Sequence, residues 1–219
     1  MGLDRVHTES YVQYIYHGLI QADNLNAETH LFLKSACQRF GVWCSGLGNG
    51  ISHPVHMEFF GVPGQSLVGC DSHTTAARSL SMLALGAGGI EVAMAMAGEP
   101  FYLNMPNIRD IRLEGCLPDW VSAKDAMLEL LRRHGVSGCK DTIFEYYGPG
   151  VSSLSVMDRH VVANLGTEMG ATTTVFLSDE KTLRFMSARG READWVPLAA
   201  EPGCGYNLEE LSIYQILSH

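Results

Sequence analysis

The fold of this chain is constrained most by alternating strand-like and helix-like stretches between residues 108 and 189. The strand-like stretches are short and apolar or alternating, and a longer helix-like stretch follows each of them. The predicted strands are residues 108–114, 142–146 and 172–176, and the predicted helices are residues 122–133, 155–169 and 179–189. Strands that alternate with helices favour a sheet covered by helices, so the sequence predicts an α/β fold.

The first half of the chain carries weaker signals. Residues 26–40 have the apolar spacing of a helix, and Gly41 ends the pattern. Three glycines in residues 46–50 predict a loop that brings the backbone close to another group. Three shorter elements follow, a buried strand at 66–70 and helical pieces at 80–85 and 90–97.

The pattern changes around Pro106, after a connecting stretch without clear periodicity. We therefore expect two units, residues 1–106 and residues 107–219. The total of 219 residues is enough for one large or two small domains.

Charge and hydropathy exclude two classes of partner. A formal net charge of −9 argues against nucleic acid, because binding to phosphate backbones is driven by lysine and arginine. The apolar stretches are all shorter than the roughly 18 residues of a membrane helix, and the first residues do not resemble a signal peptide. Because no secretory signal is recognised, we expect a cytoplasmic protein with reduced cysteines. The spacing of the six cysteines matches no zinc or iron–sulfur pattern.

Two polar motifs stand out against this background. Asp71, Ser72 and His73 follow the predicted strand at 66–70, and a second histidine-rich stretch lies at 48–58. Open α/β sheets place binding crevices at the carboxyl ends of their strands. An acid, a hydroxyl and an imidazole at such an end predict a chemical site.

These motifs, together with the glycine-rich stretch at 85–89 and the stretches at 147–151 and 164–180, resemble the aconitase superfamily. The order and spacing of the matched motifs hold from about Arg5 to about Leu211, and the chain is most similar to bacterial aconitate hydratase. The resemblance implies three-layer α/β/α units of the aconitase type. Residues 1–106 would be part of the first domain, and residues 107–219 would be the second domain.

The resemblance also implies an activity. The completed enzyme would be a hydro-lyase that interconverts citrate and isocitrate through cis-aconitate. A [4Fe-4S] cluster would polarise the hydroxyl and carboxylate of a small tricarboxylate or related hydroxy-acid substrate. Histidine–carboxylate pairs would position protons around that hydroxyl.

The resemblance assigns roles to seven residues. Three histidines match the active-site histidines, two carboxylates match their partners, one hydroxyl matches a substrate-carboxylate ligand and one amide lies near the cluster. The histidines are His17, His53 and His73. The carboxylates are Asp71, expected to pair with His53, and Glu168, expected to pair with His73. The hydroxyl belongs to Ser72 and the amide to Asn164.

The chain departs from the family pattern in several places. Tyr16 replaces the aspartate expected before His17, and a phenol with a pKa of about 10 supplies no negative charge at neutral pH. Arg78, Ser79 and Ser81 replace glycines, and we expect Arg78 to be solvated. The cluster cysteines, the catalytic serine and the substrate arginines of the family would follow the point where the chain ends, and a glutamine region would precede its start.

Three hypotheses follow. The first is a hydro-lyase segment that is inactive alone and has no metal ligands of its own, either a fragment of a longer enzyme or one piece of a split enzyme that a complementary chain completes. The second is a degenerate, non-catalytic binding or regulatory module with the same fold. The third is an independent metal hydrolase built on His53, His56 and Glu58.

Overall fold

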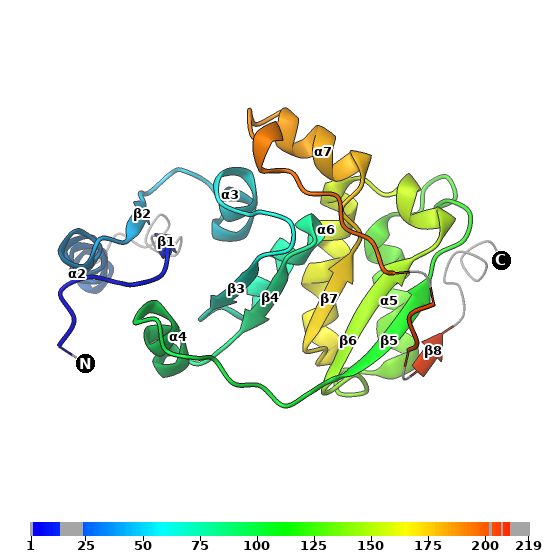
Figure 1. The fold of residues 1–219 in the computed structure, drawn as a ribbon, viewed down its shortest axis with the longest axis horizontal. Helices are drawn as coiled ribbons and strands as arrows, with labels where there is room; N and C mark the ends of the chain where they lie inside the picture. The colour runs from blue at the N-terminus through cyan, green and yellow to red at the C-terminus, as the bar shows by residue number, and fades with distance from the viewer. Residues whose placement is uncertain (1, 14–23, 202, 207, 211–219) are drawn as a thin grey trace.

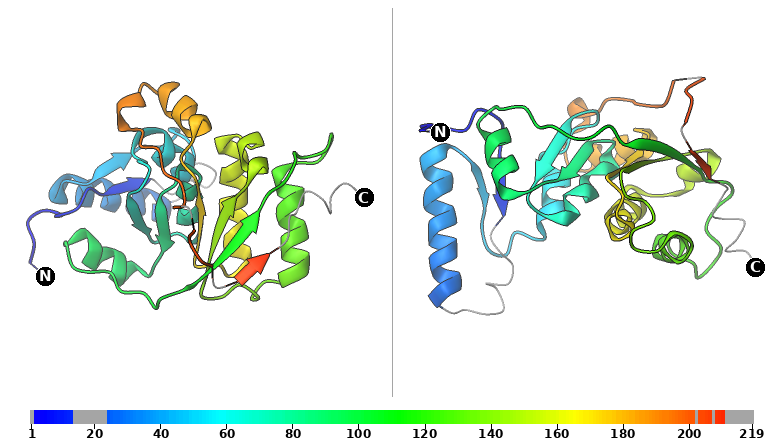
Figure 2. Two further views of the ribbon diagram at one scale, coloured as in Figure 1. Left: turned by 45° about the vertical axis from the view of Figure 1, so that its right-hand side comes forward. Right: turned by 90° about the horizontal axis from the view of Figure 1, so that it is seen from below.

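The structure of the protein is a computed structural model that describes residues 2–13, 24–201, 203–206 and 208–210. The described elements form three parallel sheets, two of them two-stranded and one four-stranded. Figure 1 shows the four-stranded sheet at one end of the molecule and helix α2 (Asn24–Phe40) at the other. The views in Figure 2 show the same lengthwise arrangement.

The four-stranded sheet confirms the alternation expected from the sequence. Its strand order is β7-β6-β5-β8, all neighbouring strands run parallel, and helices connect them. The strands are β5 (Asn107–Arg112), β6 (Thr142–Tyr147), β7 (Thr173–Phe176) and β8 (Leu208–Glu210), and the connecting helices include α5 (Ala123–His134) and α6 (Val156–Leu165). Parallel strands need such crossover helices, so the α/β class is confirmed.

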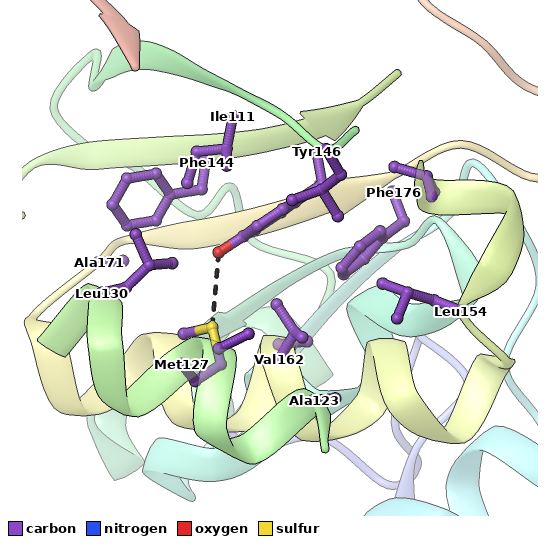
Figure 3. Close-up of a cluster of buried hydrophobic side chains, with 14 of the residues drawn as sticks. Ile111, Ala123, Met127, Leu130, Phe144, Tyr146, Leu154, Val162, Ala171 and Phe176 are labelled. Atoms are coloured by element: carbon purple, nitrogen blue, oxygen red, sulfur yellow. Dashed lines mark hydrogen bonds between the residues drawn. The ribbon is translucent and has the colours of Figure 1, made fainter. Parts of the chain in front are cut away.

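The main core lies between this sheet and helices α5 and α6. Figure 3 shows Phe144, Tyr146 and Phe176 on the strands facing Met127 and Leu130 on α5, with Val162 of α6 beside them. The Tyr146 hydroxyl is buried and donates a hydrogen bond to the sulfur of Met127 at 3.6 Å. Burial of these large side chains is the main stabilising contribution to this end of the molecule.

The remaining strands form two small sheets. Strand β1 (Tyr11–Gln13) pairs with β2 (Trp43–Ser45), and β3 (Ser66–Gly69) pairs with β4 (Leu83–Gly86). The elements around them are α2, α3 (Ser52–Phe59), the 3-10 helix η1 (Ser72–Leu80) and α4 (Gly89–Met96). The predicted helix 26–40, the strand 66–70 and the helix 90–97 are thereby confirmed within one or two residues.

The predicted helical piece at 80–85 is wrong. Helix η1 ends at Leu80, Ser81 takes a left-handed conformation with φ of 62°, and β4 follows. Strand β4 pairs in register with β3 and buries Ala84 and Leu85. Pairing with β3 therefore overrides the helical tendency of these small apolar residues.

The elements after β6 differ slightly from their predicted bounds. The short helix η2 (Pro149–Ser153) follows β6, and the long helix predicted at 155–169 is divided into α6 and η3 (Gly166–Met169). Helix α7 (Glu180–Ser187) is capped by Asp179, whose carboxylate accepts from two backbone amides. A last short helix is η4 (Glu192–Asp194). Among the described residues, we find no helix with the length and apolarity to cross a membrane.

Candidate active site

The first histidine–carboxylate pair joins α3 to the loop after β3. His53 is the second residue of α3, and its Nε2 lies 3.1 Å from Oδ1 of Asp71. Burial lowers the pKa of His53, nearby Asp71 raises it, and His73 lowers it further. Because a carboxylate only accepts, Nε2 carries the proton and Nδ1 of His53 keeps its lone pair.

Asp71 also fixes the loop that carries the second histidine. It is the N-cap of η1, and its Oδ1 accepts from the backbone amide of His73 at 2.7 Å. One carboxylate thus holds the ring of His53 and the backbone of His73.

His73 is held from the opposite side by residues 91 and 95 positions later in the sequence. Its Nδ1 lies 2.9 Å from the amide oxygen of Asn164 near the end of α6, and its Nε2 lies 3.9 Å from Oε1 of Glu168 in η3. Since an amide oxygen accepts, Nδ1 donates. Nε2, which faces Glu168, is therefore the nitrogen available for proton exchange.

The two pairs form one constellation. The imidazole centroids of His53 and His73 are 6.4 Å apart, and the side chains of Asp71 and Glu168 are each about half exposed. Two of the three predicted histidines and both predicted carboxylates therefore come together, whereas His17 lies outside the described residues.

An open cavity of about 570 Å³ lies beside this constellation. Asp71 and Ser72 contribute to its wall, while the two imidazoles are not among its lining residues. The complete lining is Cys70, Asp71, Ser72, Thr75, Leu85, Gly86, Ala87, Gly88, Glu91, Phe101, Leu103, Thr167, Ala171 and Thr172. Among the described residues, this lining offers several hydroxyls and two carboxylates and contains no lysine or arginine.

Comparison with known proteins places this site in a family. The aconitase family model (aconitate hydratase) matches residues 5–202, which is most of the chain and includes both histidine–carboxylate pairs. The chain belongs to the aconitase family.

Individual relatives support the same assignment. The mitochondrial aconitate hydratase of Saccharomyces cerevisiae is 36% identical over 198 residues, which cover 88% of this chain and 25% of that protein. The corresponding protein of Candida albicans is 36% identical over 189 residues, 85% of this chain and 24% of that protein. The aconitase–ribosomal protein bL21m fusion protein of Schizosaccharomyces pombe is 38% identical over 182 residues, 83% of this chain and 20% of that protein.

This aconitase-family chain spans about a quarter or less of the length of those curated relatives. Two of the relatives named here are described as mitochondrial, so the expected cytoplasmic location stays a prediction.

The described cysteines do not fit the iron–sulfur cluster expected from the family. Cys37 and Cys139 are buried, whereas Cys44, Cys70, Cys116 and Cys204 are exposed at separate places in the fold. No group of three or more histidine, cysteine, aspartate or glutamate side chains among the described residues is suited to hold a metal ion.

The structure likewise does not support the metal triad of His53, His56 and Glu58. Oε1 of Glu58 accepts from Arg189 at 2.6 Å, so this carboxylate is already paired with a cation. His56 packs against Phe60 and Tyr11.

Two further histidines lie near His53; His56 was expected only in the metal triad, and His160 was not predicted as a site residue. Burial, followed by the charges of His53 and Arg191, lowers the pKa of His56 to about 4. Burial and His53 also lower the pKa of His160, whose Nδ1 lies 3.1 Å from the sulfur of Met57. Two imidazoles that are neutral at pH 7 therefore lie near His53.

A threonine pair was also missed. The hydroxyls of Thr75 and Thr167 are 2.7 Å apart, and Thr167 donates to the backbone carbonyl of Ser72 at 3.3 Å. This link ties η1 to η3 and holds Ser72 at the cavity wall. Thr167 lies between two motif residues, Gly166 and Glu168, and its spacing carries no signal of its own.

The expectation of a solvated Arg78 is wrong. Its side chain is completely buried, where Nε donates to the carbonyl of Ala84 and Nη2 to the carbonyl of Thr172. Burial lowers the pKa of this guanidinium to about 8. Arg78 thus connects β4 to the segment before β7, a contact that spans 94 residues of sequence and leaves no trace in local patterning.

Proposed function

We propose that this chain is the part of an aconitase-type hydro-lyase that supplies histidine–carboxylate pairs to the reaction centre. In the completed enzyme, citrate and isocitrate would interconvert through cis-aconitate. The observation that carries the proposal is the pair of imidazoles 6.4 Å apart, each beside a carboxylate.

The arrangement suits the proton chemistry of a dehydration. Loss of water from a β-hydroxy acid breaks a C–O bond and a C–H bond, and the leaving hydroxide needs a proton. We assign that donation to Nε2 of His73, because Nδ1 is held by Asn164. Glu168 at 3.9 Å stabilises the imidazolium before transfer, and Ser72 at the cavity wall offers a hydroxyl to a substrate carboxylate.

The charge of the cavity argues that the chain alone turns over little substrate. A tricarboxylate meets Asp71 and Glu91 on the described lining and no cation. Two like charges near an anion are unfavourable, so cationic groups from another segment or chain are needed for binding.

A chimera tests the proposal. Residues 5–202 of this chain replace the matching segment of the S. cerevisiae mitochondrial aconitate hydratase, and hydration of cis-aconitate is followed by its ultraviolet absorbance. We expect the chimera to be active and the isolated chain to be inactive. In the chimera, His73→Gln should lower kcat by 10²–10⁴-fold, in line with loss of a general acid.

A control variant and a refuting outcome complete the experiment. His134→Gln, at the end of α5 and outside the constellation, should leave the activity of the chimera unchanged. A chimera that folds, binds its cluster and still fails to hydrate cis-aconitate would refute the proposal.

A non-catalytic module of the same fold is the second candidate. The observation in its favour is that the described residues of the cavity lining include no cation, together with the burial of Arg78. The same chimera distinguishes the two, since a degenerate module would give a folded but inactive protein.

A further inference from the structure

The sheet formed by β1 and β2 brings together two cysteines with opposite exposure. Cys37 lies in α2 and is 4% exposed, whereas Cys44 lies in β2 and is exposed. The chain turns back between them, and the backbone amide of Val42 donates to the carbonyl of Cys37 at 3.0 Å. The two cysteines are therefore separated by a short, closed connection.

The strand register shows which way Cys44 faces. Cys44 is the parallel partner of Val12, and paired residues of neighbouring strands project to the same face of a sheet. Val12 and Cys37 both line an apolar cavity of about 500 Å³ between the N-terminal segment, α2 and α4. Cys44 thus projects to the face of the sheet that α2 covers.

The electrostatics agree with this placement. Burial raises the pKa of the Cys37 thiol to about 11, and the neighbouring Cys44 thiol contributes further to the increase. This effect on Cys37 agrees with the strand register, which places the two side chains on the same side of the sheet.

We propose that Cys37 and Cys44 are a redox modification site, in which a hydroperoxide converts the two thiols into a disulfide that joins α2 to β2. This proposal is independent of the hydro-lyase assignment. It uses neither the histidine–carboxylate pairs nor the cavity beside them.

The chemistry proceeds in two balanced steps. The exposed Cys44 thiolate attacks hydrogen peroxide, an S–O bond forms, the O–O bond breaks, and the leaving hydroxide takes up a proton as water. The Cys37 sulfur then attacks the sulfenic sulfur of Cys44, the S–S bond forms, and the sulfenic oxygen leaves with the Cys37 proton as a second water. Two thiols lose two electrons, and one peroxide is reduced to two waters.

The raised pKa of Cys37 sets the speed of the second step. At neutral pH few Cys37 side chains are thiolates, so the sulfenic acid on Cys44 persists before the disulfide closes. Closure should become about tenfold faster for each unit of pH between pH 7 and 9.

Peptide mapping tests the site directly. The folded 219-residue chain is treated with hydrogen peroxide, alkylated, and digested with trypsin and a glutamate-specific protease. Cleavage after Lys34, Arg39 and Glu58 separates Cys37 from Cys44, and Cys44 from Cys70. We expect a disulfide-linked peptide pair that contains Cys37 and Cys44 and has lost two hydrogens, and we expect reductant to dissociate it.

Variants distinguish this outcome from general oxidation. Cys37→Ser should leave a sulfenic acid on Cys44 that a dimedone probe captures, and Cys44→Ser should leave Cys37 reduced. Cys116→Ser, an exposed cysteine on another loop, should still form the linked pair. Oxidation of Cys44 without any link to Cys37, or a link that forms only in urea, overturns the proposal.

Discussion

The four-stranded sheet and the β3–β4 sheet are packed to different extents, and the chemical groups lie mainly on the weaker one. The core against α5 and α6 contains sixteen buried apolar residues among those described, whereas the core under β4 and η1 contains six. One of the six, Val156, belongs to α6. The hydrophobic core beneath His53, Asp71 and His73 therefore includes a side chain from the larger region.

The residues of the candidate active site are also divided between the smaller and the larger region. His53 and His73 come from the smaller region, and their partners Asn164 and Glu168 come from α6 and η3 of the larger one. The constellation thus depends on how η1 docks on α6. The predicted boundary near Pro106 would separate residues that act together, and it stays a prediction about domains.

The largest effect is expected in the larger region, from Arg159→Met. Arg159 is fully buried, donates to both carboxylate oxygens of Asp179 at 3.0 and 2.6 Å, and also reaches the carbonyls of Val151 and Leu177. Removing it leaves Asp179 without its cation, which should lower the free energy of unfolding by about 3–5 kcal/mol. Urea denaturation measures the loss.

The control for Arg159 is Arg184→Met on α7. Arg184 forms an exposed ion pair with Glu180 one helical turn away, and both side chains are about 70% exposed. Such pairs contribute about 0.3–0.5 kcal/mol, so this variant should be nearly neutral. Equal losses for Arg159→Met and Arg184→Met would show that burial does not decide the difference.

A matched pair of leucines compares the two cores directly. Leu130 in the larger core and Leu80 in the smaller one are both completely buried. Each change to alanine should lower the free energy of unfolding by about 2–5 kcal/mol, with the greater loss at Leu130, where more neighbours hold the cavity open.

The histidine signals should separate these two variants further. Nuclear magnetic resonance of the imidazoles should show His53 and His73 perturbed in Leu80→Ala and unchanged in Leu130→Ala. If both variants disturb the imidazoles equally, the two cores form one cooperative unit and the comparison of regions fails.

These contrasts explain which features the sequence predicted and which it did not. Helix α5 was predicted because its signals are local, with Ser122 and Asp125 forming a capping box at its start. Strand β4 was missed because residues 83–86 suit either structure until β3 lies alongside. The pairing of His73 with Glu168 was expected only through the family resemblance, and the contact of His73 with Asn164 was not expected, since no local spacing connects residues so distant in sequence.

The smaller region should also be the more sensitive to acid, and His56 is the main reason. Its pKa is lowered from 6.5 to about 4, so between these two pH values the unfolded chain binds a proton at His56 and the folded chain does not. This contribution to stability is complete above pH 6.5 and is lost as the pH falls from 6.5 to 4. The loss is on the order of 3 kcal/mol.

His56→Phe should reduce this acid sensitivity while it keeps the ring contacts with Tyr11 and Phe60. Unfolding free energies at pH 7 and pH 4.5 measure the change. Some dependence should remain because the pKa values of His53 and His160 are lowered too. His7→Gln, at an exposed histidine, should leave the pH dependence as it is.

The smallest expected effect is a gain in stability on replacing Ser81, which lies between η1 and β4. Ser81 has a φ of 62°, and its buried hydroxyl finds no partner among the described residues. Glycine adopts this conformation without strain and removes the hydroxyl, so Ser81→Gly should raise the free energy of unfolding by about 1 kcal/mol. Ser81→Ala keeps the backbone strain and should raise the free energy of unfolding by about half as much. Ser79→Gly removes a hydroxyl that donates to the carbonyl of Ala76, so it should lower the free energy of unfolding. A loss at Ser81→Gly would mean that the left-handed residue is supported by its surroundings, and that the smaller region is better packed than its six-residue core indicates.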